Sequence, residues 1–185
     1  MKTLTQYILE SESTVAQFLK ANYKGKFKIS STPNSDGLYE VSSTGKVELK
    51  NTSATSLTNG EFIFTECKTF VVEEAEELEN LEGFPKNVKD LAVLSWLNIT
   101  DLTGMPEKLK GDLKVTQCSN LTSLKGCPKE IGGMFECSGN KKLMELEDGP
   151  THVGKIYVDD NGKKFTKSYI TSLIKIDEPE FGRGY

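Results

Sequence analysis

A short motif opens four successive units in the second half of the chain. Each copy begins with leucine and has proline four residues later, and in three copies glycine occupies the third place. The copies are Leu81–Pro85, Leu102–Pro106, Leu124–Pro128 and Leu146–Pro150. They start 21, 22 and 22 residues apart. A fixed period of this length predicts a solenoid, in which each unit of the sequence forms one coil.

Apolar residues follow each copy at matching places. An aliphatic residue stands three places after the proline, as Val88, Leu109, Ile131 and Val153. A pair separated by one residue comes next, and strand pleating points both members inward: Leu91 and Val93, Leu113 and Val115, Phe135 and Cys137, Ile156 and Val158. One unit cannot bury these side chains, but stacked units can. We therefore expect Leu124, which opens the third unit, to be fully buried.

The third unit resembles the leucine-rich repeats, in a short variant found in proteins of gut bacteria and their phages. In that variant Leu-x-Gly-x-Pro precedes Val-Gly-Gly-x-Phe-x-Cys-Ser, and the segment 131–138 reads Ile-Gly-Gly-Met-Phe-Glu-Cys-Ser. The first and fourth units depart from it, with Lys89-Asp90 and Gly154-Lys155 in place of the glycine pair. The resemblance implies an α+β fold, a short leucine-rich-repeat-like solenoid with a helical and β N-terminal cap and a C-terminal capping helix.

Four segments follow from these patterns. Residues 1–24 are expected to be helical, and residues 25–70 to form a β-rich cap that leads into the stack with Phe62 and Phe64 inward. Residues 71–165 form the coils. Residues 166–185 comprise a closing helix, capped by Thr166, and a flexible tail. The closing helix is expected to cover the last coil.

An acidic stretch stands at the start of the coil region. Residues 71–82 predict a short helix with Val71, Ala75 and Leu78 facing inward. Its glutamates include Glu73, Glu74, Glu76 and Glu77. Two interpretations stay open: a solvated surface, or a contact for a basic partner.

Composition excludes several classes of function. A net charge of −4 argues against general affinity for nucleic acid, and no apolar run is long enough to span a membrane. The four cysteines lack metal-ligand spacing and are expected to be small apolar core residues. His152, the single histidine, is expected at the surface. No catalytic constellation is visible, so neither enzymatic activity nor a cofactor or metal is predicted.

The first ten residues carry a separate resemblance. Residues 1–10 resemble the capsid-targeting leader of internal head proteins in large contractile-tailed phages, which ends in an apolar-x-Glu processing site. Ile8 and Glu10 would form that site. An ordinary amphipathic cap helix is the alternative. The protein is accordingly expected in the host cytoplasm or inside the phage particle, and not to be secreted.

These features favour a non-enzymatic protein-binding module, phage-encoded and acting on a host protein. The alternative is a virion component, either an internal head protein or a capsid-associated one. The expected binding face consists of outward-pointing strand residues: Ala92, Lys114, Met134, Glu136 and Tyr157. The acidic residues form the competing site. Trp96 fits either core filling or an exposed aromatic contact, and the oligomeric state is not predicted.

Overall fold

One sheet of eleven strands dominates the computed structural model, which describes residues 14–178. Residues 14–22 are helical, and the second helix is α2 (Lys167–Leu173). The strands are β1 (Tyr23–Lys24), β2 (Lys28–Ile29), β3 (Tyr39–Ser42), β4 (Lys46–Leu49), β5 (Phe62–Glu73), β6 (Asn87–Ser95), β7 (Lys108–Leu109), β8 (Asp112–Thr116), β9 (Glu130–Ser138), β10 (His152–Asp159) and β11 (Lys175–Ile176).

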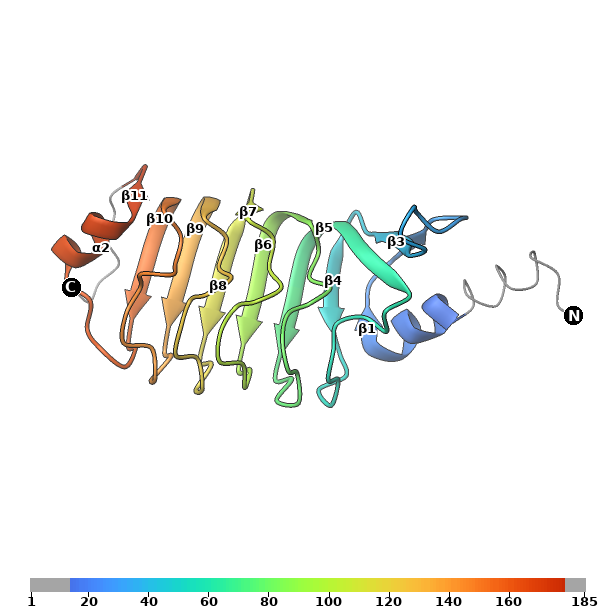
Figure 1. Ribbon diagram of the computed structural model, residues 1–185, viewed down its shortest axis with the longest axis horizontal. Coiled ribbons are helices and arrows are strands. Elements are labelled where there is room, and N and C mark those ends of the chain that lie inside the picture. The colour runs from blue at the N-terminus through green and yellow to red at the C-terminus, as the bar shows by residue number, and fades with distance from the viewer. Residues whose placement is uncertain (1–13, 179–185) are drawn as a thin grey trace, which may run out of the picture.

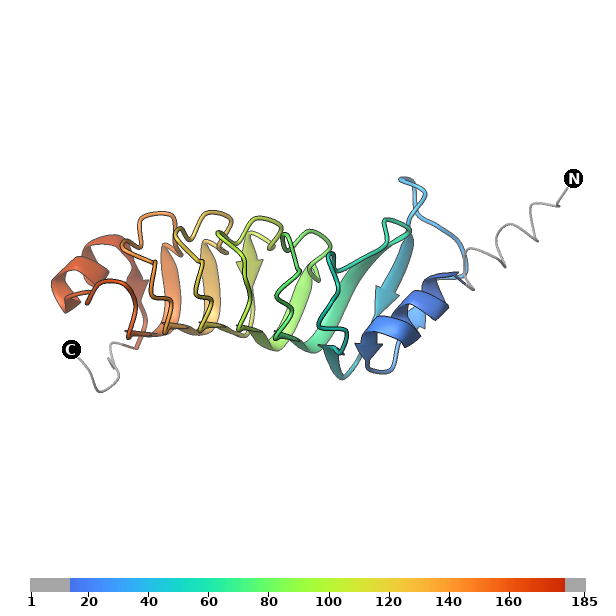
Figure 2. The same cartoon turned by 90° about the horizontal axis from the view of Figure 1, so that it is seen from below.

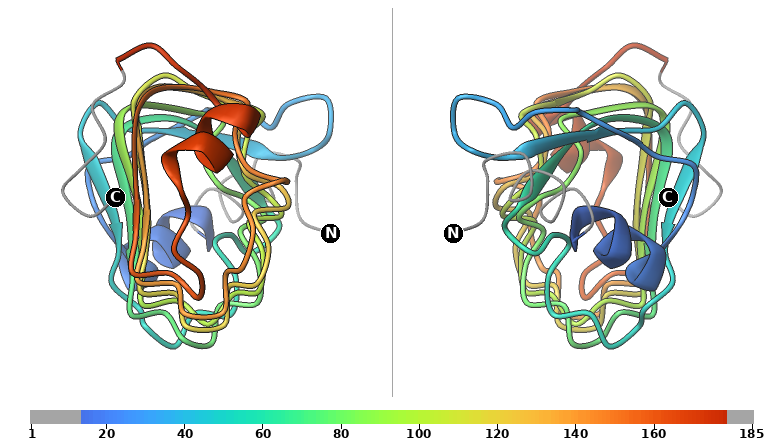
Figure 3. Two further views of the ribbon diagram at one scale, coloured as in Figure 1. Left: turned by 90° about the vertical axis from the view of Figure 1, so that its left-hand side faces the viewer. Right: turned by 90° about the vertical axis from the view of Figure 1, so that its right-hand side faces the viewer.

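The chain winds into a β-solenoid of about six coils, as the period predicts. Strands β4, β5, β6, β8, β9 and β10 lie side by side and are parallel, each contributed by one coil (Figure 1). Partners in neighbouring strands are 21 to 23 residues apart in the sequence. Seen from the ends, the coils lie behind one another with closely similar outlines (Figure 3).

Each coil places two side chains of its strand in the core. These pairs are Val47 and Leu49, Phe70 and Val72, Ala92 and Leu94, Leu113 and Val115, Phe135 and Cys137, and Ile156 and Val158. The prediction is confirmed in three units and wrong in the first. There Ala92 pairs with Leu113, so Ala92 and Leu94 point inward while Leu91 and Val93 point outward.

β5 pairs with β6 along one edge and with two shorter strands along the other. Its first part pairs with β3 and its second part with β4. Phe62 and Phe64 are buried as expected, but Phe70 and Val72 are the residues in register with the inward pairs of later coils. The coil register therefore begins at β4, within the segment expected to be a β-rich cap.

The predicted acidic helix does not form. β5 continues to Glu73, and the chain then turns without helical structure. Ala75 and Leu78 are buried in the core as predicted, and Ala75 occupies the coil position that Leu97 holds one unit later. Val71 was expected to face inward, but it is in register with the outward-pointing Val93, although little of it is accessible. The segment continues the period because the neighbouring coil fixes its path, and β5 pairs with β6 up to Glu73↔Ser95.

The Leu-x-Gly motif brings adjacent coils into direct backbone contact. The N–H of Leu102 donates to the carbonyl of Lys125, 2.8 Å away, in the next coil. Gly126, with φ 82°, follows that carbonyl, and a Cβ there would lie 2.6 Å from the carbonyl carbon of Leu102. Only glycine combines this left-handed backbone with so close an approach. Leu124 is 1% exposed, which confirms its predicted burial.

Helices lie at both ends of the stack (Figures 1 and 2). At the C-terminal end Thr166 caps α2 by accepting from the N–H of Tyr169, as predicted, and Ile170 is fully buried. At the N-terminal end Val15 and Leu19 are buried in the same core. That helix ends at residue 22, and β1 follows.

Candidate functional site

The outward-pointing residues of the strands form a continuous row across the sheet. Val93 is in register with Lys114, Lys114 with Glu136, and Glu136 with Tyr157. The Lys114 Nζ lies 2.8 Å from Glu136 Oε2. Both side chains remain partly accessible, and so do Leu91 and Met134 in the neighbouring row. We call Leu91, Val93, Lys114, Met134, Glu136 and Tyr157 the outer sheet face.

Ala92 does not belong to this face. Its side chain is fully buried between the inward residues of the flanking coils. Residues 91–94 are all apolar, so the strand could bury either Leu91 and Val93 or Ala92 and Leu94. Pairing with the adjacent strands places Ala92 opposite Phe70 and Leu113, and the smaller side chain therefore lies in the interior. As a result, the outer sheet face carries two aliphatic side chains, Leu91 and Val93, where alanine was expected.

In successive coils, the residue that follows the strand has a left-handed backbone conformation, and these residues form a column along the stack. Glu74, Trp96 and Gln117 have φ values of 56°, 56° and 57°, and Gly139 and Asp160 continue the series at 71° and 52°. The backbone N–H groups of Glu74, Trp96, Gln117 and Gly139 donate to carbonyls of the next coil, and that of Trp96 reaches the carbonyl of Thr116 at 3.1 Å. The N–H of Asp160, in the last coil, donates to the side chain of Asp159. The column turns the chain out of the sheet at the same place in successive coils.

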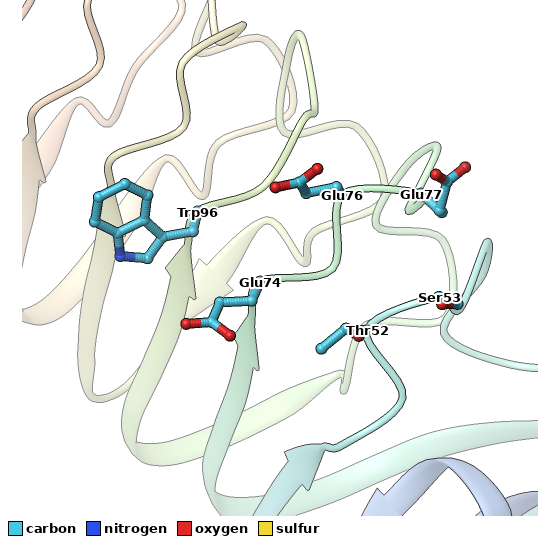
Figure 4. Close-up of a pocket in the computed structure, with 6 residues that line it drawn as sticks. All are labelled: Thr52, Ser53, Glu74, Glu76, Glu77 and Trp96. Atoms are coloured by element: carbon cyan, nitrogen blue, oxygen red, sulfur yellow. The ribbon is translucent and has the colours of Figure 1, made fainter.

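Trp96 is exposed, which answers the question that the sequence left open. Its side chain is 59% accessible, although tryptophan is usually highly buried. It lines a cavity of about 560 Å³ together with Thr52, Ser53, Glu74, Glu76 and Glu77 (Figure 4). In Figure 4, Glu74 and Glu76 extend toward the side of the indole, whereas Glu77 points away. We call these six residues the Trp96 corner.

Negative charge at this corner is not neutralised within the described part of the chain. Between residues 14 and 178, no lysine, arginine or histidine forms an ion pair with Glu74, Glu76 or Glu77. Glu73, beside the corner, accepts a hydrogen bond from Ser95 Oγ at 3.0 Å. Three of the four acidic residues singled out by sequence therefore surround one cavity together with Trp96.

Other reactive side chains are dispersed. Cys67, Cys118, Cys127 and Cys137 are free and buried, in agreement with their predicted core role. Burial raises the pKa of Cys118 to about 11 and that of Cys137 to about 12, so these thiols are poor nucleophiles at neutral pH. Among the described residues, no group of three or more His, Cys, Asp or Glu side chains is placed to hold a metal ion.

His152 is partly exposed, and its ring contacts the C-terminal segment. Its Nε2 lies 2.8 Å from Asp177 Oδ1, which links β10 to the residue that follows β11. The predicted processing site, Ile8 and Glu10, lies outside the described residues. In the described part of the chain, no helix is long and apolar enough to cross a membrane.

Comparisons of the chain with protein-family models, with curated proteins and with solved structures find no match. The class is therefore defined by geometry: a β-solenoid of about six coils with a mixed outer sheet face and an exposed aromatic residue at the end of one strand.

Proposed function

We propose that this protein is a non-enzymatic protein-binding module that uses the outer sheet face. The observation that carries the proposal is the pair of adjacent rows of partly exposed residues from neighbouring coils, in which Leu91, Val93 and Tyr157 accompany an ion pair. Solenoids present such extended surfaces to partners. Aromatic and aliphatic groups beside charge are typical of interfaces that bind proteins.

We further infer that the coils are leucine-rich-repeat-like. Leu113-x-Val115-x-x-Cys118 and Phe135-x-Cys137-x-x-Asn140 follow the Leu-x-Leu-x-x-Asn/Cys order of that repeat. Cys118 and Asn140 are both buried at the matching place. Between β4 and β10 the described coils contain strands and turns but no helix, so support for this likeness comes from the residue order and the shared burial alone.

Photo-crosslinking tests the proposed surface. Tyr157 is replaced by p-benzoylphenylalanine, a photoreactive residue of related shape, in the cells that make the protein. We expect a discrete protein adduct on irradiation, and its loss when Lys114→Glu is added. The same photoreactive residue at Met144, which is 53% exposed, serves as the control. Adducts from position 144 and none from 157 would show that another surface binds.

The second candidate function is that of a virion component. It is favoured by the residues Ile8-Leu9-Glu10, which resemble the processing site of a capsid-targeting leader. Mass spectrometry of purified particles tests it, because a processed protein would begin at Ser11. Detection of particle-bound protein that starts at Met1 would exclude processing, and absence of the protein from particles would exclude this candidate.

A further inference from the structure

Trp96 occupies a position that does not require tryptophan. The equivalent residues of the other coils are Glu74, Gln117, Gly139 and Asp160, all with the same left-handed backbone. A bulky residue is unfavourable in that conformation. With 59% of its surface accessible, the indole also contributes little to the core. Its large apolar surface is therefore available for contact with another molecule, a role in which tryptophan is enriched.

Three cavities meet at this indole. Besides the cavity of about 560 Å³, Trp96 lines one of about 320 Å³ with Glu73 and Glu74, and one of about 300 Å³ with Glu76 and Asn98. The surface on both sides of the ring is thus hollowed. An extended chain segment can lie across it with one side chain against the indole.

Charge decides what kind of side chain fits. Glu74 and Glu76 extend toward the side of the ring and have no ion-pair partner among residues 14–178 (Figure 4). The lysines that line the adjoining cavities are already engaged. Lys24 pairs with Glu48, Lys50 donates to the carbonyl of Lys20, and Lys141 pairs with Asp160.

We infer that the Trp96 corner binds an arginine side chain of an extended basic segment in the protein partner. The guanidinium group is planar, stacks on aromatic faces and donates several hydrogen bonds in a fixed geometry. Carboxylates beside the ring, Glu74 and Glu76, accept such bonds. The inference rests on the proposed protein-binding function and names the chemistry of the partner.

The single tryptophan of the chain provides a direct readout. Its emission is followed while a blocked peptide, acetyl-Gly-Arg-Gly-Arg-Gly-amide, is added at low ionic strength. We expect a saturable change in emission that weakens steeply as salt is added, because the contact is electrostatic and exposed. The peptide with citrulline in place of both arginines has the same shape without charge and should give no change. A peptide with lysine in place of both arginines should bind more weakly than the arginine peptide, because lysine lacks the planar guanidinium group.

Two variants locate the site. Glu74→Gln with Glu76→Gln keeps the side-chain shapes and should weaken peptide binding about tenfold, read from the same emission. Trp96→Gln copies the residue of the next coil and should also weaken binding about tenfold, in the range of a lost cation–π contact, measured by anisotropy of a fluorescein-labelled peptide. Glu145→Gln, an exposed carboxylate elsewhere, is the matched control and should leave binding unchanged. Equal responses to the arginine and citrulline peptides would overturn the inference.

Carbohydrate binding is the competing outcome, because sugars also stack on exposed tryptophan. A saturable emission change with cellohexaose or maltoheptaose, but none with the arginine peptide, would overturn the inference. The crosslinking at position 157 separates the two proposals. If the adduct at 157 forms and the arginine peptide fails, the inference fails and the proposed function stands. Absence of any adduct from 157 overturns the proposed function whatever the peptide does.

Discussion

The side-chain amide of Asn140 bonds to the backbone of the preceding coil at two places, Val115 and Cys118. Its Oδ1 accepts from the N–H of Cys118 at 2.9 Å, and its Nδ2 donates to the carbonyl of Val115 at 3.0 Å. Asn140 is fully buried, so water cannot replace it. One side chain thereby satisfies two backbone groups where the chain leaves the sheet.

Asn140→Ala should destabilise the protein strongly. The substitution leaves the Cys118 N–H and the Val115 carbonyl without this partner, and each unsatisfied buried group costs about 1–3 kcal/mol. We expect the free energy of unfolding, measured by denaturant titration, to fall by more than about 2 kcal/mol. Asn120→Ala, at the partly exposed asparagine that occupies an outer turn, should change it by less than about 1 kcal/mol. Equal effects of the two substitutions would contradict the buried role of Asn140.

Leu124→Asp should unfold the coils together. The side chain is 1% exposed between neighbouring coils, so the substitution buries an unpaired charge at a cost of about 3–5 kcal/mol. Because stacked units depend on their neighbours, circular dichroism and thiol labelling of the buried cysteines should report the same lowered midpoint. Met144→Asp, at a side chain that is 53% exposed, is the control. An unchanged midpoint for Leu124→Asp would contradict the stacked core.

Gly104→Ala should be costly where Gly45→Ala is not. Gly104 has φ 106°, and a Cβ there would lie 2.3 Å from the carbonyl carbon of Leu81. The strained backbone alone costs about 1–3 kcal/mol, and the two coils must also move apart. Gly45 has open space around it, so alanine there should change stability by less than about 0.5 kcal/mol. Thermal unfolding of the two variants measures the difference.

Acid should loosen the C-terminal strand. The hydrogen bond from His152 holds the pKa of Asp177 below its usual value of 3.8, and the charges of His152 and Lys175 act in the same direction. A lowered pKa in the folded state means that ionised Asp177 stabilises the contact above its unfolded pKa. That stabilisation is lost as pH falls through the folded pKa. Amide chemical shifts of residues 175–178 should therefore change below about pH 4, and Asp177→Asn should remove this pH dependence.

The repeat motif predicts the solenoid because stacked coils need the same apolar residues at the same place in every coil. It does not determine the register of the first unit, since Leu91–Leu94 are all apolar and either alternation buries two of them. Only the partner strands decide, and Ala92 lies opposite Leu113. Val71, Ala75 and Leu78 have helical spacing, which favours a helix for the acidic segment. The same spacing arises when Val71 lies near the end of β5, which continues to Glu73, and the other two fill the following turn.

The Trp96 corner was only partly visible in the sequence. The sequence shows Glu74 and Glu76 as part of an acidic run, and its pattern places Trp96 equally well in the core or at the surface. One signal was present: Gly139 and Trp96 occupy equivalent places in their units. Glycine at such a place indicates a left-handed, surface-directed residue. What the sequence lacked was the proximity of Thr52, which reaches the corner from an earlier coil.

The direction of β1 has a consequence for how far the stack can grow. β1 pairs with β4 antiparallel, through Tyr23↔Leu49 and Lys24↔Glu48, whereas the coils behind it are parallel to one another. A second molecule that extended the sheet at this end with a parallel strand would meet β1 instead. β1 runs in the opposite direction, has only two residues, and carries Lys24 in an ion pair with Glu48. Short, charged edge strands are a known protection against edge-to-edge pairing. The antiparallel strand β1 thus disfavours the addition of further parallel coils at this end, and with it the head-to-tail growth of fibres that a stack of parallel coils would otherwise allow.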